Sequence, residues 1–128
     1  MLVPLRAEDG FDSVRAFARA VAEFLADAES DLLIVEQRKA KRGGRVSIDV
    51  LRNAYGQTVM PAYAVPARPG APVSTPIEWD ELDEVDPAGF TVGSLPVRLE
   101  QRGDPWKGLR RHARGLLRAR ERLERRLG

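Results

Sequence analysis

Cysteine is absent from this 128-residue chain, and histidine occurs once, at His112. These absences exclude disulfides, thiol catalysis, Cys-ligated zinc and a histidine-rich metal site, so any bound metal must take oxygen ligands. No apolar run is long enough to cross a bilayer, and the first six residues lack the basic-then-apolar layout of a signal peptide. We therefore expect a cytoplasmic protein with no membrane partner.

Basic residues are present but unevenly distributed. Residues 107–128 contain nine Lys/Arg and two Glu, a net charge of +7, and since the whole chain carries +2, the preceding residues carry −5. The basic character belongs to the C-terminal tail, so whole-chain charge is a weak argument for nucleic-acid binding. The length suits a single domain with a modest core.

The hydrophobic pattern predicts an α/β fold. Apolar residues at helical spacing over residues 14–28 predict a helix, after a turn and N-cap at 9–12. Residues 3–5 suggest the end of a strand, and further short strands are expected at 32–35 and 46–51. At 32–35 the alternative is the entry to a turn of helix that leads into the basic stretch. Five prolines between positions 61 and 76 then predict an irregular arm.

Asp49 is the most informative residue of the chain. It is a lone carboxylate inside the apolar run 46–51, directly after the basic, glycine-broken stretch 38–45. In a strand, period-two alternation would place Ser47, Asp49 and Leu51 on one face. A carboxylate in such a place needs an explanation.

Three explanations for Asp49 remain open. It could face water at a sheet edge, or form a salt bridge to Arg45 or Arg52. It could also hold a divalent metal beside phosphates that basic side chains, Lys41 among them, and glycine N–H groups would cradle. The spacing of residues does not choose among these.

Two short helices are expected near the C-terminal end. The acidic segment 77–86 predicts a helix capped near Thr75, with Trp79 and Leu82 facing inward. A calcium or acid–base site is the alternative there, although the segment lacks the spacing of an EF-hand loop. A second helix is expected at 95–102, stopped by the Gly-Asp-Pro sequence that follows.

The arginine-rich tail predicts an amphipathic helix from residue 106 to 128, whose apolar stripe is interrupted by Arg120. Its outer arginines are either solvated charges of a docked helix or contacts to the phosphate backbone of DNA. No aromatic residue interleaves them, which argues against base stacking. The candidate backbone contacts are Arg110, Arg111, Arg114, Arg118 and Arg122.

Several sequence blocks resemble the polymerase domain of bacterial DNA ligase D, a primase-polymerase of the archaeo-eukaryotic type. They occur in one order and read KAKRGGRVSIDVLRN followed by GQT, then RPGAPVS, WDEL, FT and GDPW. They lie within residues 39–58, 68–74, 79–82, 90–91 and 103–106. The resemblance covers residues 1–106 as a C-terminal half of that domain, and the basic helical tail 107–128 lies outside it.

The resemblance implies a partial primase-polymerase fold, with a small sheet flanked by helices, a proline-rich arm and the arginine-rich helix. It implies two-metal nucleotidyl transfer in non-homologous end-joining repair, with manganese or magnesium, nucleoside triphosphates and DNA ends held in a Ku-assisted complex. Asp49 matches the third metal-binding, catalytic carboxylate. Arg42 and Arg52 match residues that contact the nucleotide phosphates, and Lys41 joins them as a candidate.

Two motifs of the family that the catalytic site needs are missing from this sequence. The Asp-x-Asp pair and a Ser-Gly-x-x-Gly-Leu-His segment lie upstream in the family, and neither occurs in this sequence. Ser47 and Val50 replace the usual aromatic neighbours of Asp49. Because one carboxylate cannot clamp two divalent ions, the chain alone is expected to be inactive.

Three hypotheses follow. The chain could be half of a polymerase domain that a complementing N-terminal half completes. It could instead be a non-catalytic module that binds DNA or nucleotide phosphates. It could also be a degenerate remnant, in which an exposed sheet edge would favour a homodimer.

Overall fold

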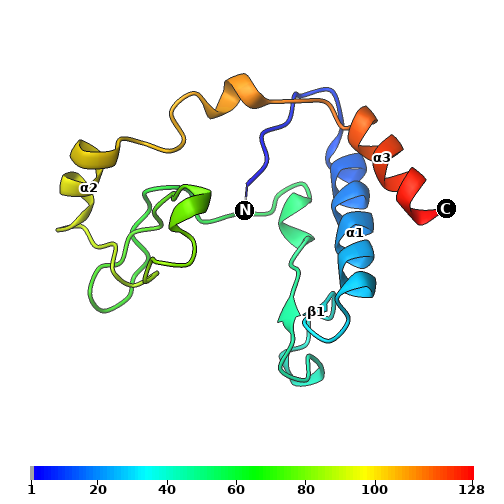
Figure 1. The fold of residues 1–128 in the computed structure, drawn as a ribbon, viewed down its shortest axis with the longest axis horizontal. Helices are drawn as coiled ribbons and strands as arrows, with labels where there is room; N and C mark the ends of the chain where they lie inside the picture. Colours follow the sequence, from blue (N-terminus) through cyan, green and yellow to red (C-terminus); the bar gives the residue numbers. More distant parts are fainter. Residues whose placement is uncertain (1) are drawn as a thin grey trace. The chain divides into compact units, whose positions relative to one another are not determined.

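The computed structural model describes residues 2–128, which form two compact units (Figure 1). One unit contains residues 2–58 together with 112–128, and the other contains residues 59–111. Within residues 2–128, three α-helices and one parallel pair of strands confirm the expected α/β class.

Helix α1 (Phe11–Ala28) forms where the sequence predicts it. Gly10 is its N-cap, and the Asp9 carboxylate accepts a hydrogen bond from the Ser13 hydroxyl at 3.1 Å, which fixes the chain entering the first turn. The apolar stripe of the helix faces the core of its unit, where Ala22 is 1% exposed. Periodicity was therefore a sufficient guide to this element.

Strands β1 (Leu33–Ile34) and β2 (Val46–Ser47) form a two-stranded parallel sheet, paired residue for residue. The amide of Ile48 still donates to the carbonyl of Ile34 at 2.9 Å, after which the chain leaves the ladder. The strand predicted at 32–35 is confirmed in its central two residues.

The second strand is shorter than predicted, which corrects the expectation for Asp49. Its Oδ1 atom accepts the N–H of Leu51 at 3.0 Å, a local turn bond that competes with strand pairing. A 3₁₀ turn, Leu51–Asn53, follows at once. Strand alternation therefore does not set the direction of this side chain.

The C-terminal tail is helical over a shorter stretch than predicted. Helix α3 spans Leu117–Leu127 and lies beside α1, and a separate 3₁₀ turn spans Leu109–His112 (Figure 1). Between the two, Arg114 pairs with Leu5 in a single parallel bridge. Because the backbone of Arg114 bonds to the N-terminal segment, it cannot continue a helix. Leu116, just before α3, is 4% exposed and anchors the segment.

The unit of residues 59–111 consists mostly of irregular chain around helix α2 (Leu95–Arg102), which confirms the helix predicted there. Gly103 ends the helix with φ +75°, a conformation that favours glycine. The amide of Val73 donates to the carbonyl of Phe90 at 2.7 Å, and Val73 is 5% exposed. The proline-rich arm is thus held by contacts within its own unit.

The acidic segment 77–86 folds differently from the prediction. It contains one 3₁₀ turn, Trp79–Glu81, rather than a helix with an apolar face. Trp79 and Leu82 are 74% and 56% exposed, so the prediction that they face inward is wrong. Glu81 takes the buried position because a cationic partner meets it there. Among residues 2–128, no helix has both the length and the apolar content to span a membrane.

Candidate functional site

A hollow of about 300 Å³ opens where the two parallel strands end. Val35 follows β1 and Ile48 follows β2, so the hollow lies at the carboxyl ends of both strands, where α/β sheets commonly bind ligands. One acid, one base and mostly apolar or neutral side chains line it: Val35, Gln37, Arg42, Ser47, Ile48, Asp49, Val50 and Leu51.

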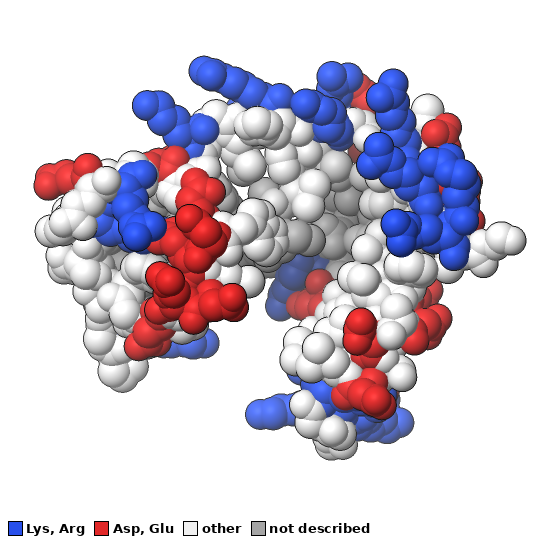
Figure 2. All heavy atoms as spheres, in the orientation of Figure 1, with Lys and Arg blue, Asp and Glu red and all other residues white. Residues whose placement is uncertain are grey.

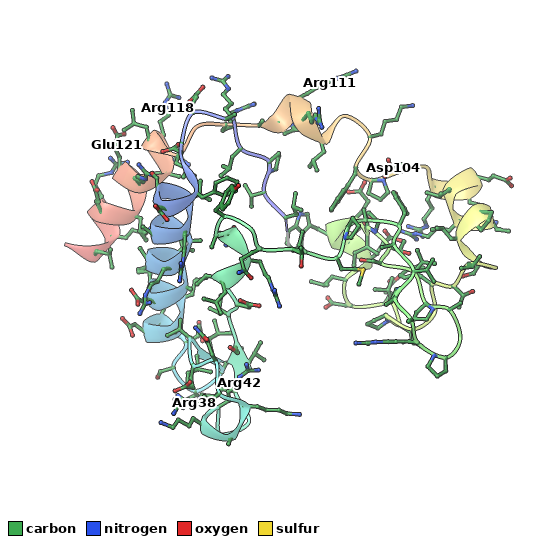
Figure 3. All side chains as sticks on the ribbon, turned by 180° about the vertical axis from the view of Figure 1, so that it is seen from behind. Arg38, Arg42, Asp104, Arg111, Arg118 and Glu121 are labelled. Carbon is green, nitrogen blue, oxygen red and sulfur yellow. The ribbon has the colours of Figure 1, made fainter. Side chains whose placement is uncertain are left out.

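Arg42 is held against the backbone at this hollow (Figure 3). Its Nε donates to the carbonyl of Glu36 at 3.1 Å, and its Nη2 donates to the carbonyl of Gln37 at 2.7 Å. The Ser47 hydroxyl donates to the same Glu36 carbonyl at 2.9 Å, which ties β2 to this loop. Among residues 2–128 no carboxylate pairs with Arg42, so its charge can serve an anion.

The neighbouring basic stretch is braced by its own backbone. Arg45 donates from Nε to the carbonyl of Arg42 at 3.0 Å and from Nη1 to the carbonyl of Ser30 at 3.3 Å. Gly43 and Gly44 have φ of +57° and +84°, so the turn between these arginines depends on glycine. Arg45 is thus a structural residue and does not neutralise the acid at the hollow.

Asp49 forms a loose ion pair with Arg52. Its Oδ2 lies 3.7 Å from the Arg52 Nε, and the two side chains are 56% and 55% exposed. Exposed pairs of this kind contribute about 0–1 kcal/mol, so the carboxylate remains accessible to water and to a ligand. The water-facing and Arg52 explanations are both correct in part.

The other candidate phosphate ligands lie at the border of the hollow or outside it. Arg52 does not line it and donates from Nη1 to the Gln57 Oε1 at 3.4 Å. Lys41 ends the 3₁₀ turn Lys39–Lys41 as an exposed side chain, also outside the lining. The structure therefore brings Arg42 and Asp49 together and leaves Lys41 apart.

The residues present do not fit a metal centre by themselves. Primase-polymerases are nucleotidyltransferases that generally use divalent metals. Within residues 2–128, however, no cluster of three or more Asp, Glu, His or Cys side chains lies close enough together to hold a metal ion. Asp49 is the single acid at the hollow, and one of its oxygens accepts the Leu51 amide. No metal-dependent step is assigned to these residues alone.

The other unit contains a buried ion pair that sequence patterns did not reveal. Glu81 is 5% exposed, and its carboxylate accepts hydrogen bonds from Arg98 at 2.6 Å and 2.8 Å and from the Glu78 amide at 2.8 Å. These bonds, with the charges of Arg98 and Arg102, lower the pKa of Glu81 to about 2. The Phe90 ring lies 4.8 Å from the Arg98 guanidinium carbon. The cluster joins the 3₁₀ turn to α2 and has a structural role.

A second polar contact closes the same unit. The Tyr63 hydroxyl donates to the Asp104 carboxylate, and Tyr63 has φ +63°. Burial, and then this hydrogen bond and the charge of Asp104, raise the pKa of Tyr63 to about 12. The hydrogen bonds from Tyr63 and from the Trp106 amide lower the pKa of Asp104. The Tyr63 hydroxyl therefore stays protonated to a higher pH than an ordinary tyrosine.

The candidate DNA-contacting arginines do not belong to one element. Arg110 and Arg111 lie in the 3₁₀ turn Leu109–His112, within the unit of residues 59–111. Arg114 lies at the bridge to Leu5, while Arg118 and Arg122 lie on α3. Figure 3 shows Arg111 and Arg118 on these two separate segments. That they contact DNA stays a prediction.

Comparisons with known proteins converge on one family. The family model described as LigD, primase-polymerase domain, matches residues 1–106. The chain is 38% identical over 109 residues to the multifunctional non-homologous end joining protein LigD of Pseudomonas aeruginosa, covering 83% of this chain and 13% of that protein. It is 26% identical over 108 residues to the bifunctional LigD of Bacillus subtilis, covering 83% and 18%.

A solved structure shows a similar fold. The polymerase domain of Mycobacterium tuberculosis ligase D in complex with DNA superposes with a TM-score of 0.75 at 28% identity. The match covers 86% of this chain and 38% of that domain. The chain thus spans less than a fifth of its curated relatives and well under half of the solved polymerase domain.

Proposed function

Because the chain belongs to the LigD primase-polymerase domain family of non-homologous end joining, we propose that it supplies part of a nucleotidyl-transfer site in DNA end-joining repair. It supplies the C-terminal portion of that site: Asp49 as one metal-binding carboxylate, and Arg42 as a ligand of the nucleotide triphosphate. Arg52, which pairs loosely with Asp49, stands beside it, and Lys41 is a further candidate outside the hollow. By itself the chain does not extend a primer. The same proposal includes a cytoplasmic location for this work, which is supported by the bacterial end-joining relatives.

One observation carries the proposal. Arg42 and Asp49 line a single hollow at the ends of two parallel strands, inside the segment that the family model matches. Arg42 offers an unneutralised positive charge on a fixed side chain, which suits a triphosphate anion. Asp49 offers an exposed carboxylate beside it. Nucleotidyl transfer needs a cation to bind the triphosphate and a carboxylate to hold the metal ion close to it, and Arg42 and Asp49 would supply these two groups.

The sheet itself supports the need for a completing polypeptide. Parallel strands are normally buried on both faces, within larger sheets. Among residues 2–128, β1 and β2 pair only with each other, and Leu32, Val35 and Val46 beside them are 57%, 37% and 58% exposed. These apolar side chains would be covered by further strands and helices of the domain, on the same polypeptide or on another. The Asp-x-Asp carboxylates would arrive with that portion.

Reconstitution tests the proposal. The portion of the P. aeruginosa LigD polymerase domain that precedes the matched region would be purified and mixed with this chain. A labelled primer–template, ribonucleoside triphosphates and Mn²⁺ then report extension. We expect extension by the mixture and none by either part. Substitution of residues that only support metal ligands typically lowers activity by about 10–100-fold. Because Asp49 would itself be a metal ligand, Asp49→Asn should lower the extension rate by more than this.

A matched control separates this role from general charge effects. Asp27→Asn removes another exposed carboxylate, on α1 and outside the hollow, and should leave extension unchanged. Arg42→Gln should raise the apparent KM for the nucleotide. A mixture that extends no primer, or one that extends equally well with Asp49→Asn, would overturn the proposal.

A further inference from the structure

The outer side of α3 carries a stripe of four arginines that the family match does not include. At about 100° per residue, positions 118, 122, 125 and 126 fall within a sector of a helix about 100° wide, whose centre lies about 120° from Leu116 and Leu123. All four side chains are exposed. Figure 2 shows Lys and Arg side chains gathered over α3. The members of this arginine stripe are Arg118, Arg122, Arg125 and Arg126.

Arg120 shows by contrast what a structural arginine does on the same helix. Its Nη2 lies 3.1 Å from the Asp9 Oδ1, and it also donates to the carbonyl and hydroxyl of Ser13. The stripe has no such partners: within residues 2–128 no hydrogen bond or ion pair engages its side chains. Glu121 and Glu124 lie on the same helix without pairing to it. Figure 3 shows Arg118 and Glu121 directed away from α1.

We propose that the arginine stripe of α3 binds the phosphate backbone of duplex DNA, independently of the nucleotidyl-transfer role proposed above. From Arg118 to Arg125 the helix rises about 10 Å, over which one DNA strand presents about three phosphates. Guanidinium groups bind phosphate through paired N–H donors. Because α3 contains no aromatic residue that could stack on bases, this contact depends on the phosphate charges and has little sequence preference.

The packing of α3 favours nucleic acid over a membrane. An amphipathic helix binds an anionic bilayer by burying its apolar side in the lipid. Here that side is largely committed: Leu116 is 4% exposed, Leu123 is partly buried, and Arg120 fixes the helix to α1, which leaves Leu117 and Leu127 at the two ends of the helix as the exposed apolar residues. What remains on the surface is mainly the charged side, which suits a hydrophilic polyanion.

The salt dependence of DNA binding by the full chain tests the proposal. Fluorescence anisotropy with a labelled 20-base-pair duplex, from 25 to 200 mM NaCl, gives the slope of log K against log salt. Each lost phosphate contact should reduce this slope by about 1. We therefore expect Arg118→Gln/Arg122→Gln to bind more weakly, with a slope smaller by about 2. Arg118→Lys/Arg122→Lys should retain most of the slope.

The matched control is Arg15→Gln/Arg68→Gln, which removes the same charge from exposed sites elsewhere. Its slope should stay close to that of the wild type, and circular dichroism should show all variants folded. Equal slopes for the stripe variant and the wild type, or equal losses in the stripe and control variants, would overturn the proposal. So would stripe-dependent binding to phosphatidylserine vesicles without binding to DNA. The slope is measured on this chain without nucleotide or Mn²⁺, so its outcome is independent of whether the reconstituted mixture extends a primer.

Discussion

Arg98 donates two hydrogen bonds to the carboxylate of Glu81, at 2.6 Å and 2.8 Å, although 17 residues separate the two in sequence. Their side chains are 11% and 7% exposed. The same guanidinium lies over Phe90 and donates to the Pro76 carbonyl at 3.4 Å. One side chain therefore connects α2 to the acidic turn, to the proline-rich arm and to the segment that precedes the helix.

Replacing Glu81 by glutamine should destabilise the unit of residues 59–111. The amide keeps the shape but leaves the Arg98 charge buried without its counterion, which is costly. Trp79 and Trp106 both lie in this unit, so tryptophan fluorescence during urea unfolding reports on it. We expect a clear fall in the urea midpoint. The control Glu84→Gln, an exposed acid nearby, should change stability by no more than about 0.5 kcal/mol.

The stability of this unit should also depend on pH through Glu81. Its pKa is about 2 in the folded chain, below the ordinary value of about 4.3 that applies when unfolded. The ionised group therefore contributes stability that is present above pH 4.3 and lost as the pH falls through 2. The urea midpoint from tryptophan fluorescence should decline over this interval. Glu81→Gln should flatten the decline, and parallel curves for the two proteins would contradict the assignment.

Arg120→Met should loosen α3 from α1. The change removes the ion pair with Asp9 and the hydrogen bonds to Ser13. Hydrogen bonds to charged groups contribute about 1.5–3 kcal/mol, and because the arginine is about one-third exposed we expect a smaller loss, of about 1–2 kcal/mol. Thermal unfolding by far-ultraviolet circular dichroism measures this loss. Arg118→Met, on the outer side of α3, should have little effect, and equal losses in both variants would refute the docking role.

Tyr63 should ionise far above the usual range. Burial and the hydrogen bond to Asp104 raise its pKa to about 12, from an ordinary value near 10. In a Tyr55→Phe variant, absorbance at 295 nm follows Tyr63 alone, because the chain has two tyrosines. Asp104→Asn should shift the titration toward 10. A Tyr63 titration near 10 in the presence of Asp104 would contradict the structure.

Helices that depend on nearby residues in the sequence could be predicted from the sequence. The helices at 11–28 and 95–102 follow from apolar periodicity and from glycine at or near their ends. The family resemblance likewise rests on short motifs that can be read directly. The candidate pair of Arg42 and Asp49 came from that resemblance, and the structure places both at one hollow.

The direction of individual charged side chains was beyond local patterns. Asp49 was expected on a strand face, but one hydrogen bond to the Leu51 amide places it beyond the ladder. In the acidic segment, nothing local distinguishes Glu81 from its neighbours. It is buried because Arg98 meets it from α2.

The sequence by itself therefore determined the α/β class, the presence of all three helices and the kinship, since these depend on residue order over short distances, but it did not determine where α3 begins. The tertiary structure decided which charges are buried and which face water. On α3, Arg120 turns inward to Asp9, whereas Arg118 stays outside. The physical reason is that burying a charge requires a partner, and each partner here lies far away along the chain.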